Sequence, residues 1–336
     1  EIRLSLVGSE MCIRDRFSRM SVPLFMIVSA FLLVPMQEGM SAVAFYKRRA
    51  VRILPAFLFF MIIYSTVPVL WNQIDLETSA TDLARIPLNF PTLAGHLWFM
   101  YPLISLYLFI PFISPWLAKA KASEERLFIG LFFISTCMPY LTRFFGEIWG
   151  QCFWNEFHAL WYFSGYLGYL VLAHYIRVHL DWSRTKRLAV GSCLTVIGAV
   201  WTILSFYIQA VPGQLHVTPE LEIGWSFCTI NCVMLTTGAF LLFTCIRRTE
   251  APRWISELSN LSYGMYLMHI LWLGLFVSIF KGQMQLPTAV AIPVIALATF
   301  LSCAVSTKLL SLIPFCRWMI GINRSPNKER QLSVLR

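Results

Sequence analysis

The sequence predicts an all-α fold, a polytopic bundle of transmembrane helices, and three observations support this. Of the 336 residues, 57% are hydrophobic and 13% are charged, and the mean hydropathy is +0.65. Soluble proteins have roughly 45–50% apolar and about 25% charged residues. The apolar residues form nine continuous runs, and Lys and Arg concentrate in alternate connections between the runs. Together these features exclude a water-soluble enzyme.

Each run is near the roughly 20 residues that a helix needs to cross a bilayer. In chain order, the predicted spans are 18–36, 53–71, 97–117, 127–142, 158–176, 188–209, 224–246, 263–280 and 287–307. An outer-membrane barrel would need alternating segments of about ten residues, whereas these runs are continuous and longer. We therefore predict nine helical spans in this chain.

The basic residues predict the orientation of these spans. The connections after the first, third, fifth and seventh spans, together with the C-terminal segment, hold 20 Lys and Arg; the remaining connections hold 3. Because basic residues stay on the cytoplasmic side, the C-terminus is predicted to be cytoplasmic. The same distribution explains the net charge of +10 through contact with anionic lipid headgroups. The expected partner is the lipid bilayer, with no nucleic acid.

The N-terminal segment departs from this pattern. Arg3, Arg14, Arg16 and Arg19 precede the first span, where an odd number of spans would place them outside. Residues 1–16 hold no initiator Met at position 1, no signal-peptide pattern and no spanning run, and they look like a translated sequencing adapter. We therefore expect a non-native leader at 1–16, a transmembrane domain at 17–310 that lacks its first helix, and a cytoplasmic tail at 311–336. The intact protein would have ten spans.

Cysteine usage predicts neither a disulfide scaffold nor a metal site. Apart from Cys12 in the expected leader, only Cys152 of the nine cysteines falls outside the spans and off the cytoplasmic side. Disulfides form in oxidising compartments, and a single thiol there has no partner. No Cys or His group has zinc-ligand spacing. We expect no metal and no bound cofactor.

A basic segment precedes the second span. Arg49 and Arg52 are three residues apart, with Lys47 and Arg48 alongside, so a helix starting here would place the pair on one face. A guanidinium group can bind a phosphate or carboxylate through two parallel hydrogen bonds. The alternative, which the pattern alone favours, is an anchor that reaches lipid headgroups.

Two histidines are candidate site residues. His96 immediately precedes the third span, at its outer end and beside Trp98, either as part of an interfacial aromatic belt or as a partner for a polar substrate. His269 follows Tyr266 about two turns into the eighth span. Ionisable groups at membrane depth usually face a cavity or the bundle interior. His269 is therefore either a site residue or a hydrogen-bonded structural residue.

Five ordered motifs resemble one family, the acyltransferase 3 family of bacterial inner-membrane proteins. They are S-x-x-S-V-P-L-F-x-x-x-S-x-F-L from Ser18, R-x-x-R-I-x-P from Arg49, H-L-W-F-x-x-x-L-x-x-L-Y-L-x-x-P from His96, WYFSGYLGYLVL from Trp161 and L-S-x-x-S-Y-G-x-Y-L-x-H from Leu258. Within the family, the chain looks most like the enterobacterial-common-antigen O-acetyltransferase type, which has no appended soluble domain.

The resemblance implies transfer of an acyl group, usually acetyl, from cytoplasmic acyl-CoA to a hydroxyl of a carbohydrate or lipid-linked glycan. It implies that Arg49 and Arg52, with Arg48 beside them, contact the phosphates of the donor acetyl-CoA, and this reverses the preference for an anchor. The candidate substrate-binding residues are Arg19, Ser29, Trp98 and Tyr266.

The chain departs from the family pattern in two places. Ala30 follows Ser29 where family members usually have Gly. The resemblance also places the essential histidine, the general base, on a helix upstream of Ser18, so the catalytic residue is unknown here; His96 and His269 are supporting candidates and this fragment is expected to be inactive. Two alternatives remain open: a transporter or flippase of glycan or lipid precursors, and a non-catalytic membrane partner.

Overall fold

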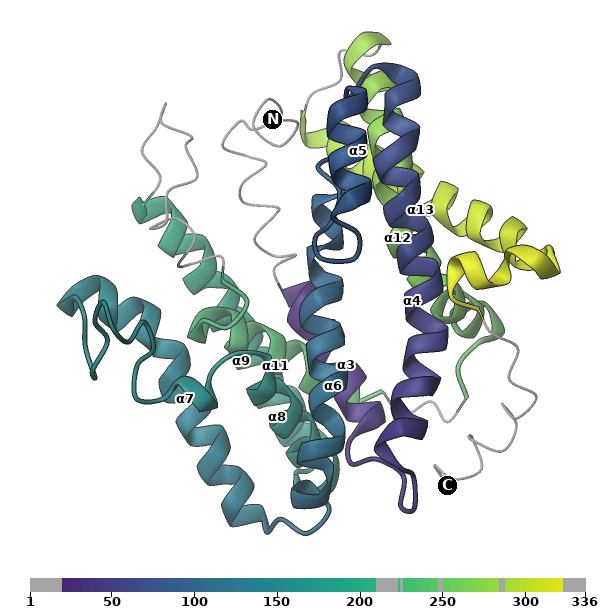
Figure 1. Cartoon of the computed structure of the whole chain (residues 1–336). Coiled ribbons are helices and arrows are strands. Elements are labelled where there is room, and N and C mark those ends of the chain that lie inside the picture. The colour runs from purple at the N-terminus through teal and green to yellow at the C-terminus, as the bar shows by residue number, and fades with distance from the viewer. Residues whose placement is uncertain (1–19, 210–222, 224–225, 247–249, 284–287, 323–336) are drawn as a thin grey trace. The chain divides into compact units, whose positions relative to one another are not determined.

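The protein is helical throughout the part that the structure describes (Figure 1). The computed structural model describes residues 20–209, 223, 226–246, 250–283 and 288–322. These residues belong to two compact units. The first comprises Glu1–Met40 and Pro102–Arg248, and the second comprises Ser41–Tyr101 and Thr249–Arg336.

The first unit is a helical bundle in which α8 packs against both α3 and α7, and α9 packs along α11. Its elements are α3 (Ser21–Leu33), the greater part of α6 (Met100–Leu117), α7 (Ala122–Phe145), η4 (Trp161–Phe163), α8 (Tyr166–Val178), α9 (Arg184–Gln209) and α11 (Ile230–Thr244). Polar side chains join three of these helices: Asn231 donates to the Thr202 hydroxyl at 2.9 Å and accepts from the Tyr140 hydroxyl at 3.0 Å. Such bonds between helices strengthen association in a bilayer.

Glycines let the backbones of α9 and α11 touch. A Cβ added to Gly238 would lie 2.5 Å from the backbone nitrogen of Thr195, and one added to Gly198 would lie 2.5 Å from the backbone nitrogen of Leu235. Small residues at helix contacts allow this approach in membranes.

Gly238→Ala is therefore expected to lower the thermal stability of the purified protein and its abundance in the membrane. Backbone atoms must move to admit the methyl group, and overpacking costs about 1–3 kcal/mol. Melting temperatures in detergent test this, with Gly130→Ala on α7 as the matched control. Nothing lies within 4 Å of a Cβ at Gly130, so the control should be neutral or slightly stabilising. Equal melting temperatures for the two variants would contradict the assigned packing.

The second unit is built on α4, α12 and α13. Its elements are α4 (Ala42–Thr66), η2 (Val67–Trp71), α5 (Leu76–Ala84), η3 (Gly95–Phe99), the first turn of α6, α12 (Arg253–Gln283), α13 (Thr288–Leu312) and η5 (Pro314–Ile320). Asp75 caps the short α5 by accepting a hydrogen bond from the Thr78 backbone nitrogen at 2.7 Å. Hydrogen bonds from the Thr78 side chain and backbone hold the pKa of the Asp75 carboxyl below its usual range. The described part of the predicted tail includes η5, which packs on α4, α12 and α13.

The prediction of nine spans is confirmed only in part. Within the described residues, six helices are long and apolar enough to cross a bilayer: Ala42–Trp71, Gly95–Leu117, Ala122–Phe145, Arg184–Ser205, Arg253–Phe280 and Val290–Leu312. The other three predicted spans, 18–36, 158–176 and 224–246, correspond to shorter helices of 13, 13 and 15 residues. At about 1.5 Å per residue, these reach roughly 20–23 Å, against a hydrocarbon core of about 30 Å.

Backbone conformation explains why two of these helices, α8 and α3, are short. Gly165 has φ +74° and immediately precedes α8, so the helix cannot extend back to His158. In the first predicted span, Val34 is extended and ends α3. Apolar composition indicates that a segment is buried or in lipid, but it does not exclude such turns.

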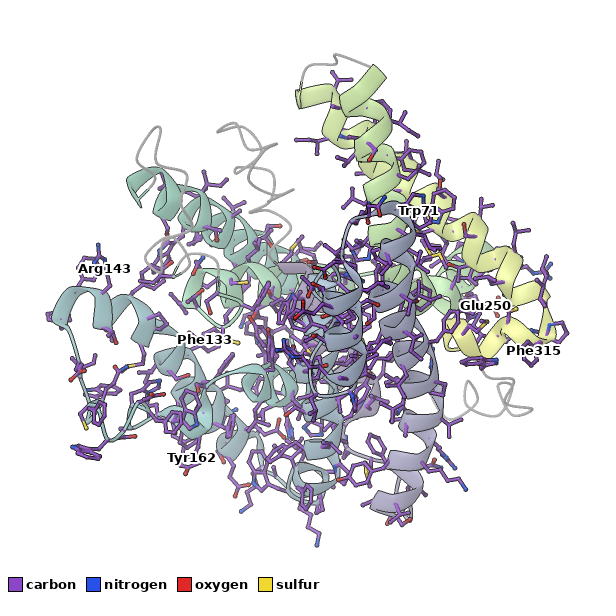
Figure 2. All side chains as sticks on the ribbon, turned by 45° about the horizontal axis from the view of Figure 1, so that its top comes forward. Trp71, Phe133, Arg143, Tyr162, Glu250 and Phe315 are labelled. Carbon is purple, nitrogen blue, oxygen red and sulfur yellow. The ribbon has the colours of Figure 1, made fainter. Side chains whose placement is uncertain are left out.

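Many large apolar side chains point outward from both units. Figure 2 labels Trp71 and Phe315 on the second unit and Tyr162 on the first, and their exposed fractions are 67%, 77% and 84%. Soluble proteins rarely expose extensive apolar surface. Together with the six long apolar helices, this supports a multi-pass membrane protein.

Candidate functional site

Two histidines that are far apart in the sequence lie close together in the second unit. His96 lies in η3 and His269 lies in α12, and their ring centroids are 4.7 Å apart. Tyr266 and Tyr64 complete the cluster, with ring centroids 5.8 and 5.2 Å from the His96 ring. The structure thus brings together the third and fifth motifs, which are far apart in the sequence.

Backbone carbonyl groups hold the cluster in place. The Leu267 carbonyl oxygen accepts from the Tyr64 hydroxyl at 2.9 Å and from His96 Nε2 at 3.3 Å. The Tyr266 hydroxyl donates to the His96 carbonyl oxygen at 2.5 Å. These hydrogen bonds connect α4, η3 and α12 at the histidine cluster. His96 is therefore part of a packed polar cluster and not simply a member of an interfacial belt.

The hydrogen bonds also indicate which histidine nitrogens carry protons. A carbonyl oxygen can only accept, so His269 Nδ1, which lies 2.5 Å from the Tyr266 carbonyl oxygen, carries the hydrogen. In the neutral ring, Nε2 then holds a lone pair. By the same argument, His96 Nε2 carries the hydrogen and Nδ1 holds the lone pair; that buried atom has no hydrogen-bond partner among the described residues. Each neutral ring therefore keeps one nitrogen that can accept a hydrogen bond.

A pocket of about 660 Å³ lies beside the cluster, between α12 and α13. Its wall includes His269 and Tyr266, together with hydroxyl groups of Ser262 and Thr299, and is otherwise mainly apolar. Concave apolar sites with a few placed polar groups are typical of small-molecule binding sites. The pocket could therefore take an acyl or lipid chain and present a polar group to His269.

The predicted arginine pair lies near the start of α4. Both Arg49 and Arg52 fall inside this helix, as the spacing requires for a shared face. Arg48 and Arg52 are exposed, whereas Arg49 is half-buried with its guanidinium 5.5 Å from the centre of the Phe45 ring. A planar cation above an aromatic face is held in a defined orientation.

The Ser-Tyr-Gly motif of α12 contacts the same part of α4. The Tyr263 hydroxyl donates to the Ile53 carbonyl oxygen at 2.9 Å. A Cβ on Gly321, which has φ +69°, would lie 2.4 Å from the Tyr263 ring and 3.0 Å from the Arg52 carbonyl oxygen. From Arg52, α4 runs twelve residues, or about 18 Å, to Tyr64 in the histidine cluster. One helix therefore links both candidate regions.

The other sequence-predicted residues are Trp98, Ser29 and Arg19. Trp98 lies in η3 and is half-buried, with its ring centroid 6.1 Å from that of Phe99. Ser29 lies in α3 of the first unit and is half-buried. Arg19, the expected leader and the expected upstream helix lie outside the described residues, so their roles stay predictions.

Sequence reasoning missed two groups that the structure brings together. Tyr64 lies in a long apolar run. The sequence feature that could have indicated its role is the phenol itself, because a buried tyrosine hydroxyl usually needs a hydrogen-bond partner. The second group, Glu125 with His174 and His179, belongs to the first unit. His174 and His179 have the H-x4-H spacing that zinc ligands can use, so the prediction that no histidine group has such spacing was wrong for this pair. Glu125 is far from them in the sequence and lies among charged neighbours that suggest a surface segment.

The fold and the site define a multi-pass helical membrane protein with two histidines beside a pocket. The acyltransferase 3 family model, described as an acyltransferase domain, matches residues 2–308. This is most of the chain, and the protein therefore belongs to the acyltransferase 3 family. The match begins within residues 1–16, whose foreign origin stays a prediction. No curated protein and no solved structure shows significant similarity to the chain.

Proposed function

We propose that the protein moves an acetyl or similar acyl group from cytoplasmic acyl-CoA to a hydroxyl of a cell-envelope glycan or lipid-linked saccharide. The proposed location is the bacterial inner membrane, with the C-terminus in the cytoplasm. The observation that carries this proposal is the arrangement of α4, which has Arg49 and Arg52 near one end and Tyr64 in the histidine cluster towards the other.

The arginine end suits the donor. Acyl-CoA carries several phosphates joined to its thioester by a long flexible arm, and paired guanidinium groups bind phosphate with charge-assisted hydrogen bonds. The basic residues predict that this end of α4 faces the cytoplasm, where acyl-CoA is found. An arm that follows α4 from the arginines would bring the thioester towards the histidine cluster.

The reaction is an attack of the acceptor hydroxyl oxygen on the thioester carbonyl carbon. A new C–O ester bond forms, the C–S bond breaks, and the CoA sulfur leaves and takes up a proton. The hydroxyl proton must pass to a base, which contributes about 10²–10⁴ in rate. The products are an acyl ester of the glycan and free CoA.

Within the described residues, His269 is the group that the geometry best supports for contact with the acceptor. Its Nδ1 is bonded to the Tyr266 carbonyl oxygen and it lines the pocket, so Nε2 can accept the hydrogen bond of the acceptor hydroxyl. The resemblance places a further histidine upstream of Ser18, and His269 would act beside it.

Transfer of radiolabelled acetyl groups from acetyl-CoA to envelope glycan tests the function. Membranes of cells that express the protein with the upstream helix that the resemblance implies should incorporate label, whereas the 336-residue chain alone is expected to be inactive. Incorporation independent of the protein would refute the proposal. Movement of a glycan precursor across the membrane without acylation would support the transporter alternative instead.

A further inference from the structure

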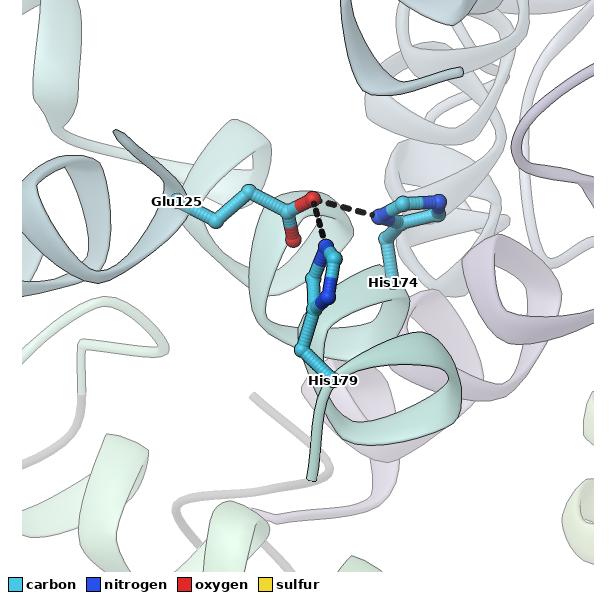
Figure 3. Close-up of side chains that lie close together, drawn as sticks. All are labelled: Glu125, His174 and His179. Carbon is cyan, nitrogen blue, oxygen red and sulfur yellow. Dashed lines mark hydrogen bonds and ion pairs between the residues drawn. The ribbon is translucent and has the colours of Figure 1, made fainter. Parts of the chain in front are cut away.

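Three potential metal ligands that have no role in the proposed acyl transfer lie close together in the first unit. Glu125 lies in the first turns of α7, His174 lies near the end of α8, and His179 is the residue that caps the C-terminus of α8. Figure 3 shows both imidazole rings turned towards the Glu125 carboxylate. Glu125 Oε1 lies 2.9 Å from His174 Nδ1 and 3.1 Å from His179 Nε2.

Burial of the Glu125 carboxylate as a charged group costs folding free energy unless a cation compensates the charge. The Glu125 side chain is 0% exposed and the His174 side chain 3% exposed, whereas His179 is 21% exposed. Both hydrogen bonds go to Oε1, and the buried Oε2 has no hydrogen-bond partner among the described residues. A buried charge normally requires pairing or coordination to a metal. The unsatisfied Oε2 therefore indicates that a cation binds here, because the hydrogen bonds from the two histidines leave this oxygen without a partner.

The ligand atoms have the spacing of a divalent-metal site. One donor atom from each of the three residues lies within 4.8 Å of the others. A tetrahedral zinc ion with bonds of about 2.0–2.2 Å holds its ligand atoms about 3.3–3.6 Å apart, so small side-chain adjustments would suffice. Two imidazoles and one carboxylate are a ligand set that zinc and similar divalent ions accept.

We propose that Glu125, His174 and His179 bind a zinc-class divalent cation that joins the first turns of α7 to the end of α8. Three protein ligands leave one position for water, and the partly exposed His179 marks the side from which an ion can enter. Arg177 supports the site by donating to the Phe31 and Val34 carbonyl oxygens of the α3 segment at 2.6 and 2.5 Å, which fixes the end of α8 that carries both histidines.

Metal binding by the purified full chain tests the site directly. The protein, carrying no histidine tag, is stripped with EDTA in detergent, dialysed against Zn²⁺ or Co²⁺, and analysed for bound metal by mass spectrometry. We expect one equivalent of Zn²⁺, displacement of Co²⁺ by Zn²⁺, and visible Co²⁺ bands without the intense sulfur charge-transfer band that cysteine ligands would give. Zinc should also raise the melting temperature. Absence of stoichiometric binding would overturn the proposal.

Variants locate the ion. Glu125→Gln keeps the size of the side chain and an oxygen that can accept from the histidines, but it lacks the charge; it should lower the Zn²⁺ affinity about 100-fold or more and abolish the thermal shift. His179→Gln should do the same. Glu124→Gln is the matched control, because the Glu124 carboxylate accepts from the Lys121 backbone nitrogen and lies outside the cluster. Wild-type zinc binding by Glu125→Gln, or a sulfur band in the Co²⁺ spectrum, would place the ion elsewhere and overturn the assignment.

Discussion

Replacing both Arg49 and Arg52 with alanine is expected to weaken acyl-CoA binding by about 10²-fold or more and to abolish acyl transfer. Each charge-assisted hydrogen bond contributes about 1.5–3 kcal/mol, and about 1.4 kcal/mol corresponds to a tenfold change in affinity. Both residues lie on α4 near its start, and the exposed Arg52 leaves its guanidinium accessible to a ligand. Equilibrium binding of acetyl-CoA to the purified variant measures the effect without requiring turnover.

Two further variants separate a donor site from a membrane anchor. Lys47→Ala removes one charge from the same basic segment, but its position is about 200° around the helix from Arg49, so acyl-CoA binding should be nearly unchanged. Replacing Arg49 and Arg52 with lysine keeps the charge but loses the paired guanidinium geometry, so binding should be intermediate. Equal loss in Lys47→Ala and the double alanine variant would favour the anchor, as would full binding in the double alanine variant together with reduced membrane abundance.

The sequence located the helices better than it located their ends. Each predicted span overlaps a described helix because long apolar runs mark lipid-facing or buried segments, although three of these helices are shorter than the predicted spans. The second predicted span began at Ile53, whereas α4 begins at Ala42, because the basic segment is polar yet compatible with a helix. Conversely, the fifth span was predicted too long, since one left-handed glycine, Gly165, interrupts an otherwise apolar run.

The sequence predicts individual residues of the candidate site, but it does not predict which of them lie next to each other. His96 and His269 were identified because imidazoles at membrane depth are unusual, and the arginine spacing required only a helix. That the two rings lie 4.7 Å apart depends on how η3 packs against α12, which residue types alone do not specify. The Glu125 cluster was missed for the same reason, because its carboxylate and imidazoles come from separate helices.

Replacing His269 with glutamine is expected to lower kcat for acyl transfer by about 10²-fold or more in the active protein, while acetyl-CoA binding stays unchanged. Glutamine is polar and similar in size to histidine, which limits the disturbance of α12, but its amide cannot take up a proton at neutral pH. A positioned group that takes part in proton transfer contributes about 10²–10⁴ in rate, and His269 lines the pocket, where it would assist the general base that the resemblance places upstream of Ser18.

The split between kcat and donor binding distinguishes this role from a structural one. A purely structural His269 would tolerate glutamine, or would lose activity together with thermal stability. His158→Gln is the matched control, because His158 lies in the first unit, belongs to neither cluster and makes a local hydrogen bond, in which its Nδ1 accepts from the Leu160 backbone nitrogen at 3.2 Å. Wild-type kcat in His269→Gln would remove His269 from the reaction and leave the proton transfer to the histidine that the resemblance places upstream of Ser18. A selective loss of kcat in His269→Gln alone, with an unchanged melting temperature, would place this ring at the acceptor hydroxyl.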